Sequence, residues 1–511
     1  MSVVEVDGLY FDYGDKKLFT NASLRVFNTD HLGVVGLNGV GKTTLLNLLV
    51  KNLSPDKGSI TWDPSIRYGY LDQHADIMHD ISIKDYLLKL YAPLFKKEEE
   101  INYIYEHLME YDDSDKMLNK AYKMQEELER EDFYSINTRI ETICSGLGLN
   151  EFGLDRKLNK LSGGQREKVI LAKLLLEEPD VLIMDEPTNF LDVAQIDWLT
   201  KYLNSFKGAF IVVSHDVSFL NDITNSIACV ENSTITKYKG NYDAFLMQNE
   251  AKKEEYEKLY NRQRKFIAKT QDFIDRNLVR ATTTKQAQSR RKMLEKLDIL
   301  EKPTQEHILH FKFPYSSPSG KEVLHVNNLT IGYEFPILEN LNFDIKKDEI
   351  IVLIGHNGVG KSTFIKTVLG IIAPLGGNYK WGEHLTISYF AQDERFYDQT
   401  PLSYIHDVYP EMKEQELRAL LASFGVNSKL CNKSMLKLSG GEQTKVRMAL
   451  MSKKKSNLLI LDEPTNHLDV SSKESLKKAL KDYPGTVIVV SHEKDFYEEI
   501  ATRIISIKDK K

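Results

Sequence analysis

Two segments, GLNGVGKTT at 36–44 and GHNGVGKST at 355–363, carry the residue types that hold a polyphosphate. Their glycines allow consecutive backbone N–H groups to turn toward phosphate oxygens, at the positive end of the helix that follows. The lysine supplies a point charge for the β- and γ-phosphates, and the next Thr or Ser supplies a hydroxyl for Mg²⁺. The sequence therefore predicts two loops that bind ATP with Mg²⁺, made by Gly36, Asn38, Gly39, Gly41, Lys42, Thr43 and Thr44 and by Gly355, Asn357, Gly358, Gly360, Lys361, Ser362 and Thr363.

Each loop is followed along the chain by an apolar run that ends in Asp-Glu and by a second run that ends in Val-Val-Ser-His. An aspartate at the end of a strand can hold the hydration shell of Mg²⁺, and the adjacent glutamate is then placed to polarise an attacking water. The histidine is expected to touch the γ-phosphate and the water. The predicted residues are Asp185, Glu186 and His215 in the first set and Asp462, Glu463 and His492 in the second.

A third repeated motif, Leu-Ser-Gly-Gly, starts at Leu161 and again at Leu438. A serine and two glycines that open a helix form an anion site. No lysine accompanies them, so the natural partner of each motif is the γ-phosphate held by the other copy. We therefore expect two composite sites in a head-to-tail arrangement, closed by ATP and released by hydrolysis. Their further residues are Ser162, Gly163 and Gly164 and Ser439, Gly440 and Gly441.

The spacing of these blocks indicates a duplicated unit with one insertion. From the first loop glycine to a glutamine, Gln73 or Gln392, there are 37 residues in both copies. The interval from that glutamine to Leu-Ser-Gly-Gly is 88 residues in the first copy and 46 in the second, an insertion of 42 residues before Leu161. Short apolar runs that lead into glycine loops and helix-period segments are typical of buried parallel strands. An α/β fold is therefore predicted for both copies.

This motif set resembles that of the ABC-type ATPases, and its tandem arrangement resembles the ABC-F proteins, which lack membrane domains and act on ribosomes. The resemblance covers nearly the whole chain. It implies two ABC-type P-loop nucleotide-binding domains in tandem, with an inserted helical arm in the first and a helical-hairpin linker between them. The expected ranges are 1–247 for the first domain, with an acidic arm at about 95–137, 248–317 for the linker and 318–511 for the second domain.

The resemblance also implies roles for individual residues. An aromatic side chain stacks on each adenine, a glutamine contacts Mg²⁺ and water, the signature serine serves the opposite site, and a short loop joins the two sites. The residues that match are Tyr13 and Tyr333, Gln73 and Gln392, Ser162 and Ser439, and the loops 189–192 and 466–469.

One residue departs from the family pattern. Phe190 stands where the second copy has His467, which is also the usual residue of the family. Whether the two sites behave alike is therefore left open.

The segment between the copies has no counterpart in either of them, and its pattern is helical. Apolar pairs recur every seven residues, which favours an amphipathic helix with a partner, and a second apolar series indicates a returning helix. These residues are Leu259/Tyr260, Phe266/Ile267 and Phe273/Ile274, then Met293, Leu297 and Leu300. We expect a hairpin with its tip near 277–288 and its end at Pro303.

The charge of this segment differs from that of the whole chain. Between Arg262 and Lys292 there are ten Lys and Arg residues against two Asp, whereas the chain has a net charge of −6. A solvated helix face would have the same composition, but positive charge concentrated on one projecting element is typical of contact with phosphate backbones. The resemblance agrees, because it implies a linker near the P-site tRNA. The candidate RNA contacts are Arg276, Arg280, Lys285, Arg290, Arg291 and Lys292.

The insertion is acidic, with thirteen Asp and Glu against four Lys and Arg between Glu98 and Asp132. Its apolar residues indicate another helical hairpin, which resembles the arm of some ABC-F proteins; they are Ile101, Tyr105, Leu108, Tyr122 and Leu128. An acidic arm is expected to avoid bare rRNA and to contact a basic ribosomal protein. A solvated hairpin without a partner is the alternative.

The composition fits a folded cytoplasmic chain. Of 511 residues, 41% are hydrophobic and 28% charged, and no apolar run reaches the length of a membrane span. We expect a monomeric ATPase that binds the ribosome near the tRNA exit site and modulates elongation, tRNA positioning or the rescue of stalled ribosomes. The ATPase subunit of a membrane ABC transporter and a nucleotide-gated binding protein with incidental hydrolysis are the alternatives. The short linker tip favours a general translation role, and antibiotic resistance is left open.

Overall fold

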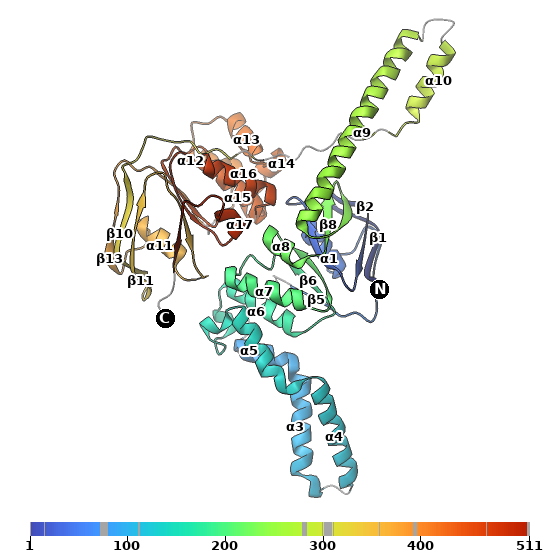
Figure 1. Ribbon diagram of the computed structural model, residues 1–511, viewed down its shortest axis with the longest axis vertical. Helices are drawn as coiled ribbons and strands as arrows, with labels where there is room; N and C mark the ends of the chain where they lie inside the picture. The colour runs from blue at the N-terminus through green and yellow to red at the C-terminus, as the bar shows by residue number, and fades with distance from the viewer. Residues whose placement is uncertain are drawn as a thin grey trace.

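The computed structural model describes residues 2–14, 16–71, 80–110, 113–277, 284–298, 300, 309, 311–356, 358–391, 396–466 and 468–507. Five residues of the predicted sites, Gln73, Arg280, Asn357, Gln392 and His467, lie outside these ranges. The two copies lie side by side as two lobes, and two helical hairpins project from the first lobe in opposite directions (Figure 1).

Each lobe is built on a mostly parallel sheet whose central strands are buried apolar runs. The first-copy sheet has the order β5-β6-β7-β3-β8-β9, and only its edge pair β8 and β9 is antiparallel. Strands with both faces covered read as continuous hydrophobic runs. The strands are β3 (His31–Val35), β5 (Tyr68–Tyr70), β6 (Val181–Asp185), β7 (Ala209–Val213), β8 (Ser226–Glu231) and β9 (Thr234–Lys239).

The second-copy sheet repeats this topology. Its order is β14-β15-β16-β12-β17, which matches the first five strands of the other sheet position by position. The predicted duplication of an α/β unit is therefore confirmed. The strands are β12 (Ile350–Ile354), β14 (Ile387–Phe390), β15 (Leu458–Asp462), β16 (Thr486–Val490) and β17 (Arg503–Ser506).

An antiparallel sheet of three strands covers the outer end of each lobe (Figure 1). Its inner face packs on the parallel sheet and on the helix after the phosphate loop, and this helix is buried on the side of that core. The strands are β1 (Ser2–Tyr13), β2 (Lys16–Phe27) and β4 (Lys57–Trp62), and β10 (Glu322–Gly332), β11 (Pro336–Lys346) and β13 (Gly376–Trp381).

Helices cover the opposite face of each parallel sheet and form the second core of each lobe. In the first copy these helices are α2 (Ile83–Leu88), α5 (Ile136–Gly146), α6 (Gly163–Leu176), α7 (Val193–Ser205) and α8 (Val217–Ile223). In the second they are α12 (Pro401–Val408), α13 (Glu414–Ser423), α14 (Ser428–Cys431), α15 (Gly440–Met451), α16 (Val470–Lys481) and α17 (Lys494–Tyr497). The helices after the phosphate loops, on the side of the antiparallel sheets, are α1 (Lys42–Leu49) and α11 (Lys361–Val368).

The insertion forms the arm, a hairpin of α3 (Ala92–Glu106) and α4 (Ser114–Arg130). Ile101 and Leu128 are buried between its helices as their apolar spacing predicts, while Tyr105 and Tyr122 face solvent. Ion pairs also join the helices, from Lys97 Nζ to Glu127 Oε2 at 2.6 Å and from Lys120 Nζ to Glu100 Oε1 at 2.5 Å.

The segment between the copies forms the linker hairpin, made of α9 (Tyr242–Asn277) and α10 (Thr284–Glu295). Ile274 is buried against α10, as predicted, but Leu259 is 48% exposed and Phe266 is 44% exposed. The predicted tip at 277–288 is shorter in the structure, because 284–288 already belong to α10. The returning helix ends at Glu295, and a backbone contact holds the chain beyond it, since Leu300 N donates to Gln263 Oε1 at 2.8 Å.

The start of the linker hairpin is built into the first lobe. Tyr242 and Phe245 of α9 are buried in the first-copy core. Further along the chain, Phe311 packs edge-on against Phe424, and Tyr315 pairs with Ser456 beside β15. Apolar contacts therefore anchor α9 in the first copy and hold the segment from Phe311 on the second copy.

Candidate functional site

Each phosphate loop joins a central strand to a helix that has no side-chain cap. The helices α1 and α11 start after Gly41 and Gly360, whose φ values of 108° and 105° are left-handed and favour glycine. Neither residue offers a side-chain acceptor to the first turn. The backbone N–H groups at these two helix starts can therefore bind an anion.

The loop lysines are held inside the loops. Lys42 Nζ donates to Gly36 O at 2.8 Å, and Lys361 Nζ donates to Gly355 O at 2.8 Å. Both side chains are buried, and burial lowers the pKa of each ammonium, while the nearby Glu186 and Glu463 carboxylates oppose that shift. Each lysine is thus a desolvated positive charge at the place where the loop would receive phosphates.

A carboxylate and a hydroxyl lie together beside each lysine. Burial raises the pKa of Asp185, while the Thr43 hydroxyl beside it opposes the shift. Burial likewise raises the pKa of Asp462, to about 6, and Ser362 opposes it. Both carboxylate oxygens of Asp462 are buried without a well-directed hydrogen bond to the described residues. Hard oxygen ligands of this kind fit a hydrated Mg²⁺, which would satisfy those two oxygens.

The glutamates that follow these aspartates adopt a strained backbone. Glu186 has φ 48° and Glu463 has φ 50°, in the left-handed region that non-glycine residues rarely occupy. Each is held there by a neighbouring strand, because Glu186 N donates to Val213 O at 2.8 Å and Glu463 N to Val490 O at 3.0 Å. The geometry turns both carboxylates out of the sheet end and into the site.

The histidines approach these glutamates in both copies. His215 Nε2 lies 3.5 Å from Glu186 Oε1, and His492 Nε2 lies 2.9 Å from Glu463 Oε1. His215 is also 3.3 Å from Lys42 Nζ, and its backbone N–H donates to Glu186 Oε2 at 3.2 Å. In each copy, the glutamate and the histidine predicted to act on the water and the γ-phosphate therefore lie next to each other at the end of the parallel sheet.

Burial raises the pKa of Glu186 to about 8. Between the ordinary glutamate pKa and about 8, the folded chain keeps a proton that the unfolded chain has lost, so this group lowers stability as pH rises. Glu186→Gln should therefore stabilise the nucleotide-free protein, by a gain that grows from about pH 4.5 to about pH 8 and is constant above that. The melting temperature should rise by about 2–4 °C per kcal/mol recovered. Thermal unfolding across this range checks it, and a pH-independent difference would contradict it.

The Leu-Ser-Gly-Gly motifs open α6 and α15. Ser162 Oγ accepts from Gln165 N and Ser439 Oγ accepts from Glu442 N, both at 3.3 Å, in reciprocal capping boxes. These serines cap their own helices and at the same time line the central cavity.

One cavity of about 1000 Å³ connects all of these groups across the border between the lobes. Residues of both phosphate loops, both Leu-Ser-Gly-Gly motifs, both glutamates and both histidines line it. Tyr13 lines it too and is 69% exposed; Tyr333 is 61% exposed at the end of β10 but does not reach the cavity wall. The predicted site residues are thus gathered from both copies.

The lobes face each other about an approximate two-fold axis. Ser218 and Asp495 occupy equivalent positions, 277 residues apart, and hydrogen-bond to each other across the border. The Asp469 carboxylate of the second copy opposes the lowering of the Lys42 pKa by burial. The equivalent Asp192 carboxylate of the first copy does the same for the Lys361 pKa. Each phosphate loop therefore lies near the loop that follows Asp-Glu in the opposite lobe.

Two contacts across the border were not predicted from the sequence. His356 Nδ1 lies 3.0 Å from Asp192 Oδ2, and Lys473 Nζ donates to the backbone oxygen of His215 at 3.1 Å. Neither contact can form in the other half of the repeat, because Leu37 stands at the position that matches His356 and Ile196 at the position that matches Lys473. A position-by-position comparison of the copies would have marked them.

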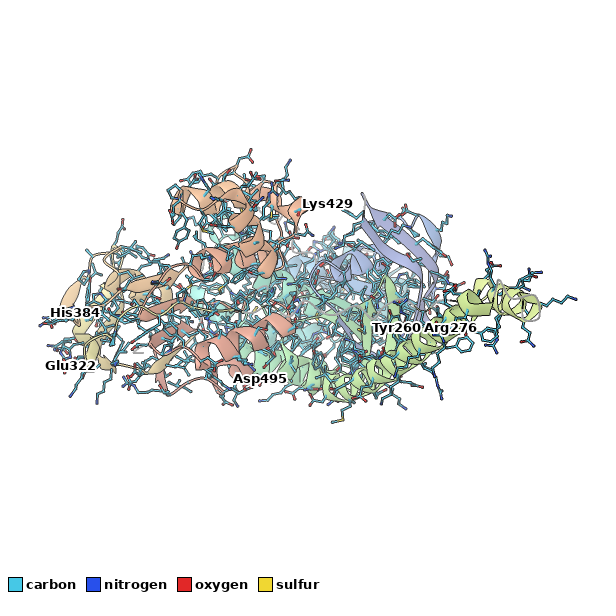
Figure 2. All side chains as sticks on the ribbon, turned by 90° about the horizontal axis from the view of Figure 1, so that it is seen from above. Tyr260, Arg276, Glu322, His384, Lys429 and Asp495 are labelled. Atoms are coloured by element: carbon cyan, nitrogen blue, oxygen red, sulfur yellow. The ribbon has the colours of Figure 1, made fainter. Side chains whose placement is uncertain are left out.

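The basic residues in the described part of the linker hairpin are exposed, and none of them lines the cavity. Arg276 lies on the part of the hairpin that projects from the lobes (Figure 2). The Arg290 guanidinium stacks on Phe273 at 3.9 Å, so this arginine also holds α10 on α9. Arg276 pairs with Asp272 at 2.9 Å, and Arg291 pairs with Glu295 at 3.2 Å. Exposed pairs of this kind are weak, so these cations can exchange partners. Lys285 and Lys292 are exposed as well.

Comparison with known proteins agrees with this architecture. A family model described as ABC transporter matches residues 19–189 and 338–466, and another of the same description matches 228–313, a range that contains the linker hairpin. The ATP-binding protein YfmM of Bacillus subtilis, named as an uncharacterized ABC transporter protein, is 42% identical over 505 residues, covering 98% of each chain. ABC transporter F family member 2 of Arabidopsis thaliana is 32% identical, covering 99% of this chain and 77% of that protein.

Solved structures show the same fold at lower identity. The archaeal ribosome recycling factor aABCE1, solved with the ribosomal stalk protein aP1, has a TM-score of 0.61 at 20% identity, covering 98% of this chain and 87% of that chain. A structure of RNase-L Inhibitor has a TM-score of 0.60 at 20% identity with the same coverage. Within the described part of the chain, every helix is too short or too polar to cross a bilayer. The chain therefore belongs to the ABC family of ATPases and, within it, to the F family.

Proposed function

We propose that this protein hydrolyses ATP at two composite sites, each made of the phosphate loop of one copy and the Leu-Ser-Gly-Gly motif of the other. The observation that carries the proposal is the cavity that both loops and both motifs line. The reciprocal approach of Lys42 to Asp469 and of Lys361 to Asp192 supports the head-to-tail pairing. Closure around ATP would then bury both nucleotides between the lobes.

The positions of the side chains support the following proposed roles. Lys42 and Lys361 bind the phosphates, Tyr13 stacks on one adenine, and the N–H groups at Ser162 and Ser439 meet the γ-phosphate of the opposite site. For Tyr333, which does not line the cavity, the same stacking role rests on family membership alone. Thr43 with Asp185, and Ser362 with Asp462, are the residues that would hold Mg²⁺, whose charge would offset that of the phosphates. We also propose that Gln73 and Gln392 belong to the two groups of residues that would hold Mg²⁺.

The glutamates act as general bases in this proposal. Glu186 or Glu463 accepts a proton from the water that attacks the γ-phosphorus, and ADP leaves as the bond to the γ-phosphate breaks. His215 and His492 orient the water and the γ-phosphate. A pKa of about 8 for Glu186 lies near neutral pH, where a base is effective.

We further propose that the partner is the ribosome in the cytoplasm, where the protein modulates elongation, tRNA positioning or the rescue of stalled ribosomes as a monomer. Membership of the F family supports this, and archaeal ABCE1, which has the same fold, is described as a ribosome recycling factor in one structure and as ribosome-bound in another. The linker hairpin, with its exposed cations, is the element that would meet rRNA or P-site tRNA. The acidic arm would meet a basic ribosomal protein.

Sedimentation with purified 70S ribosomes tests the partner. The protein should pellet with ribosomes when ATP is present and should be released as ATP is consumed. Ribosomes should also raise its rate of ATP turnover. Equal amounts of the protein in the pellet with and without ribosomes would count against the proposal. A rate of ATP turnover that ribosomes do not change would also count against it, and either result would favour a role outside translation.

A further inference from the structure

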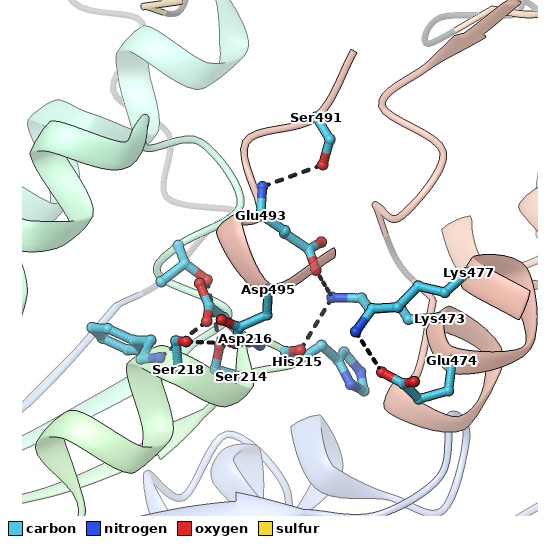
Figure 3. Close-up of polar contacts among 12 residues, drawn as sticks. Ser214, His215, Asp216, Ser218, Lys473, Glu474, Lys477, Ser491, Glu493 and Asp495 are labelled. Atoms are coloured by element: carbon cyan, nitrogen blue, oxygen red, sulfur yellow. Dashed lines mark hydrogen bonds and ion pairs between the residues drawn. The ribbon is translucent and has the colours of Figure 1, made fainter. Parts of the chain in front are cut away.

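Lys473 of α16 is a buried cation that belongs to the second copy but contacts the first. It is 7% exposed, and its Nζ donates to Glu493 Oε2 of its own copy at 2.7 Å and to the backbone oxygen of His215 at 3.1 Å (Figure 3). A buried ammonium is costly unless it is paired and hydrogen-bonded. Glu493 supplies the pairing inside one lobe, so the bond to His215 is the part that depends on the other lobe.

That bond acts on a residue whose main chain already holds the predicted base. His215 N–H donates to Glu186 Oε2 at 3.2 Å, while its carbonyl accepts from Lys473. The ring of the same residue lies 3.3 Å from Lys42 Nζ. One residue thus connects a side chain of the opposite lobe with the glutamate and the lysine of the first-copy site.

The second-copy site has no such contact among the described residues. The position equivalent to Lys473 is Ile196, an apolar residue that lines the cavity from α7. The position equivalent to Glu493 is Asp216, whose Oδ1 caps α8 by accepting from Phe219 N at 3.0 Å. An isoleucine cannot donate a hydrogen bond to the carbonyl of His492.

We propose that Lys473 is a positioning residue for the hydrolysis site on the first-copy phosphate loop, and that it makes this site depend on lobe contact in a way the second site does not. In the closed arrangement its ammonium fixes the His215 main chain, and through it the Glu186 carboxylate and the His215 ring. The inference rests on the proposed hydrolysis at composite sites and goes beyond it by making the two sites unequal.

Variants that keep only one of the two glutamates, Glu186 or Glu463, allow the hydrolysis rate of each site to be measured separately. Lys473→Met is made in a Glu463→Gln protein, which keeps Glu186, and in a Glu186→Gln protein, which keeps Glu463. In the first background kcat should fall about tenfold with KM for ATP nearly unchanged, the size expected when a reacting group is misplaced slightly. In the second background kcat should not change. Lys473→Arg should restore most of the loss.

Lys477 provides the matched control. It lies one turn further along α16 and is equally buried at 7%, and within the described part of the chain its ion pairs are those with Glu474 and Glu499 of its own copy. Lys477→Met should therefore affect both backgrounds alike, as a stability change would. A Lys473→Met protein that loses activity equally in both backgrounds, or in neither, would overturn the inference. Absence of ATP hydrolysis by the unmodified protein would instead refute the proposed function itself.

Discussion

Replacement of both Glu186 and Glu463 by glutamine should leave ATP binding intact and lower kcat for hydrolysis by about 10²-fold or more, the usual contribution of a general base. Glutamine keeps the shape of the side chain but cannot accept the proton of the water. The phosphate loops, with Lys42 and Lys361, are untouched and should still hold the nucleotide. With ATP bound and not cleaved, the lobes should stay closed and the protein should stay on ribosomes.

Steady-state hydrolysis, ATP binding by a fluorescent analogue and sedimentation with ribosomes measure the three parts of this result. Glu151→Gln is a suitable control, because Glu151 also lines the cavity but lies away from the strand ends that carry Glu186 and Glu463. It should hydrolyse ATP nearly as the unmodified protein does. Normal turnover by the double variant, or its prompt release from ribosomes in ATP, would show that these glutamates are not the bases.

Neutralisation of Arg290, Arg291 and Lys292 to glutamine should weaken ribosome binding by about tenfold or more and flatten its salt dependence. Each lost contact with a phosphate lowers the slope of log K against log salt by about 0.7 to 0.9, so three lost contacts lower it by about 2 to 3. Binding titrations at several salt concentrations measure both effects. Circular dichroism checks that the linker hairpin persists, because Arg290 also packs on Phe273.

Three exposed lysines on the second copy, Lys429, Lys433 and Lys437, provide a charge-matched control. Their replacement by glutamine changes the net charge by the same amount at a surface outside the linker hairpin, and it should leave the slope nearly unchanged. An unaltered slope in the hairpin variant, or an equal change in the control, would exclude the hairpin as the element that contacts RNA.

The duplicated fold was predictable because it rests on local patterns. The apolar runs that become β6 and β15 are flanked by the same motifs at a constant offset, and buried parallel strands leave few other arrangements. The same reasoning placed Asp185 and Glu186 at a strand end. The left-handed backbone of Glu186 was not predictable, because only the neighbouring strand β7 holds it there.

The packing of the linker hairpin was only partly predictable. Seven-residue spacing identified α9 as a helix with an apolar stripe, but Leu259 and Phe266 of that stripe are exposed. The physical reason is length, since α9 has 36 residues and α10 only 12. A returning helix of that size covers the stripe near the tip and leaves the lower part uncovered.

Contacts across the border between the lobes could not be predicted from sequence patterns of this kind. Lys473 and His215 are 258 residues apart, and their approach depends on how two separately folded units meet. The repeat still carries a signal, since Lys473 replaces Ile196 and His356 replaces Leu37 at matched positions. Such differences between otherwise equivalent positions mark places where the two copies have different tasks.

A structure of the Glu186→Gln/Glu463→Gln protein with ATP and Mg²⁺ would show directly whether the two sites are composite. Two nucleotides should lie between the lobes. The γ-phosphate of one should contact Lys42 and the helix start at Ser439, and that of the other should contact Lys361 and the helix start at Ser162. Nucleotides that contact residues of a single copy only, with the two lobes apart, would contradict this prediction.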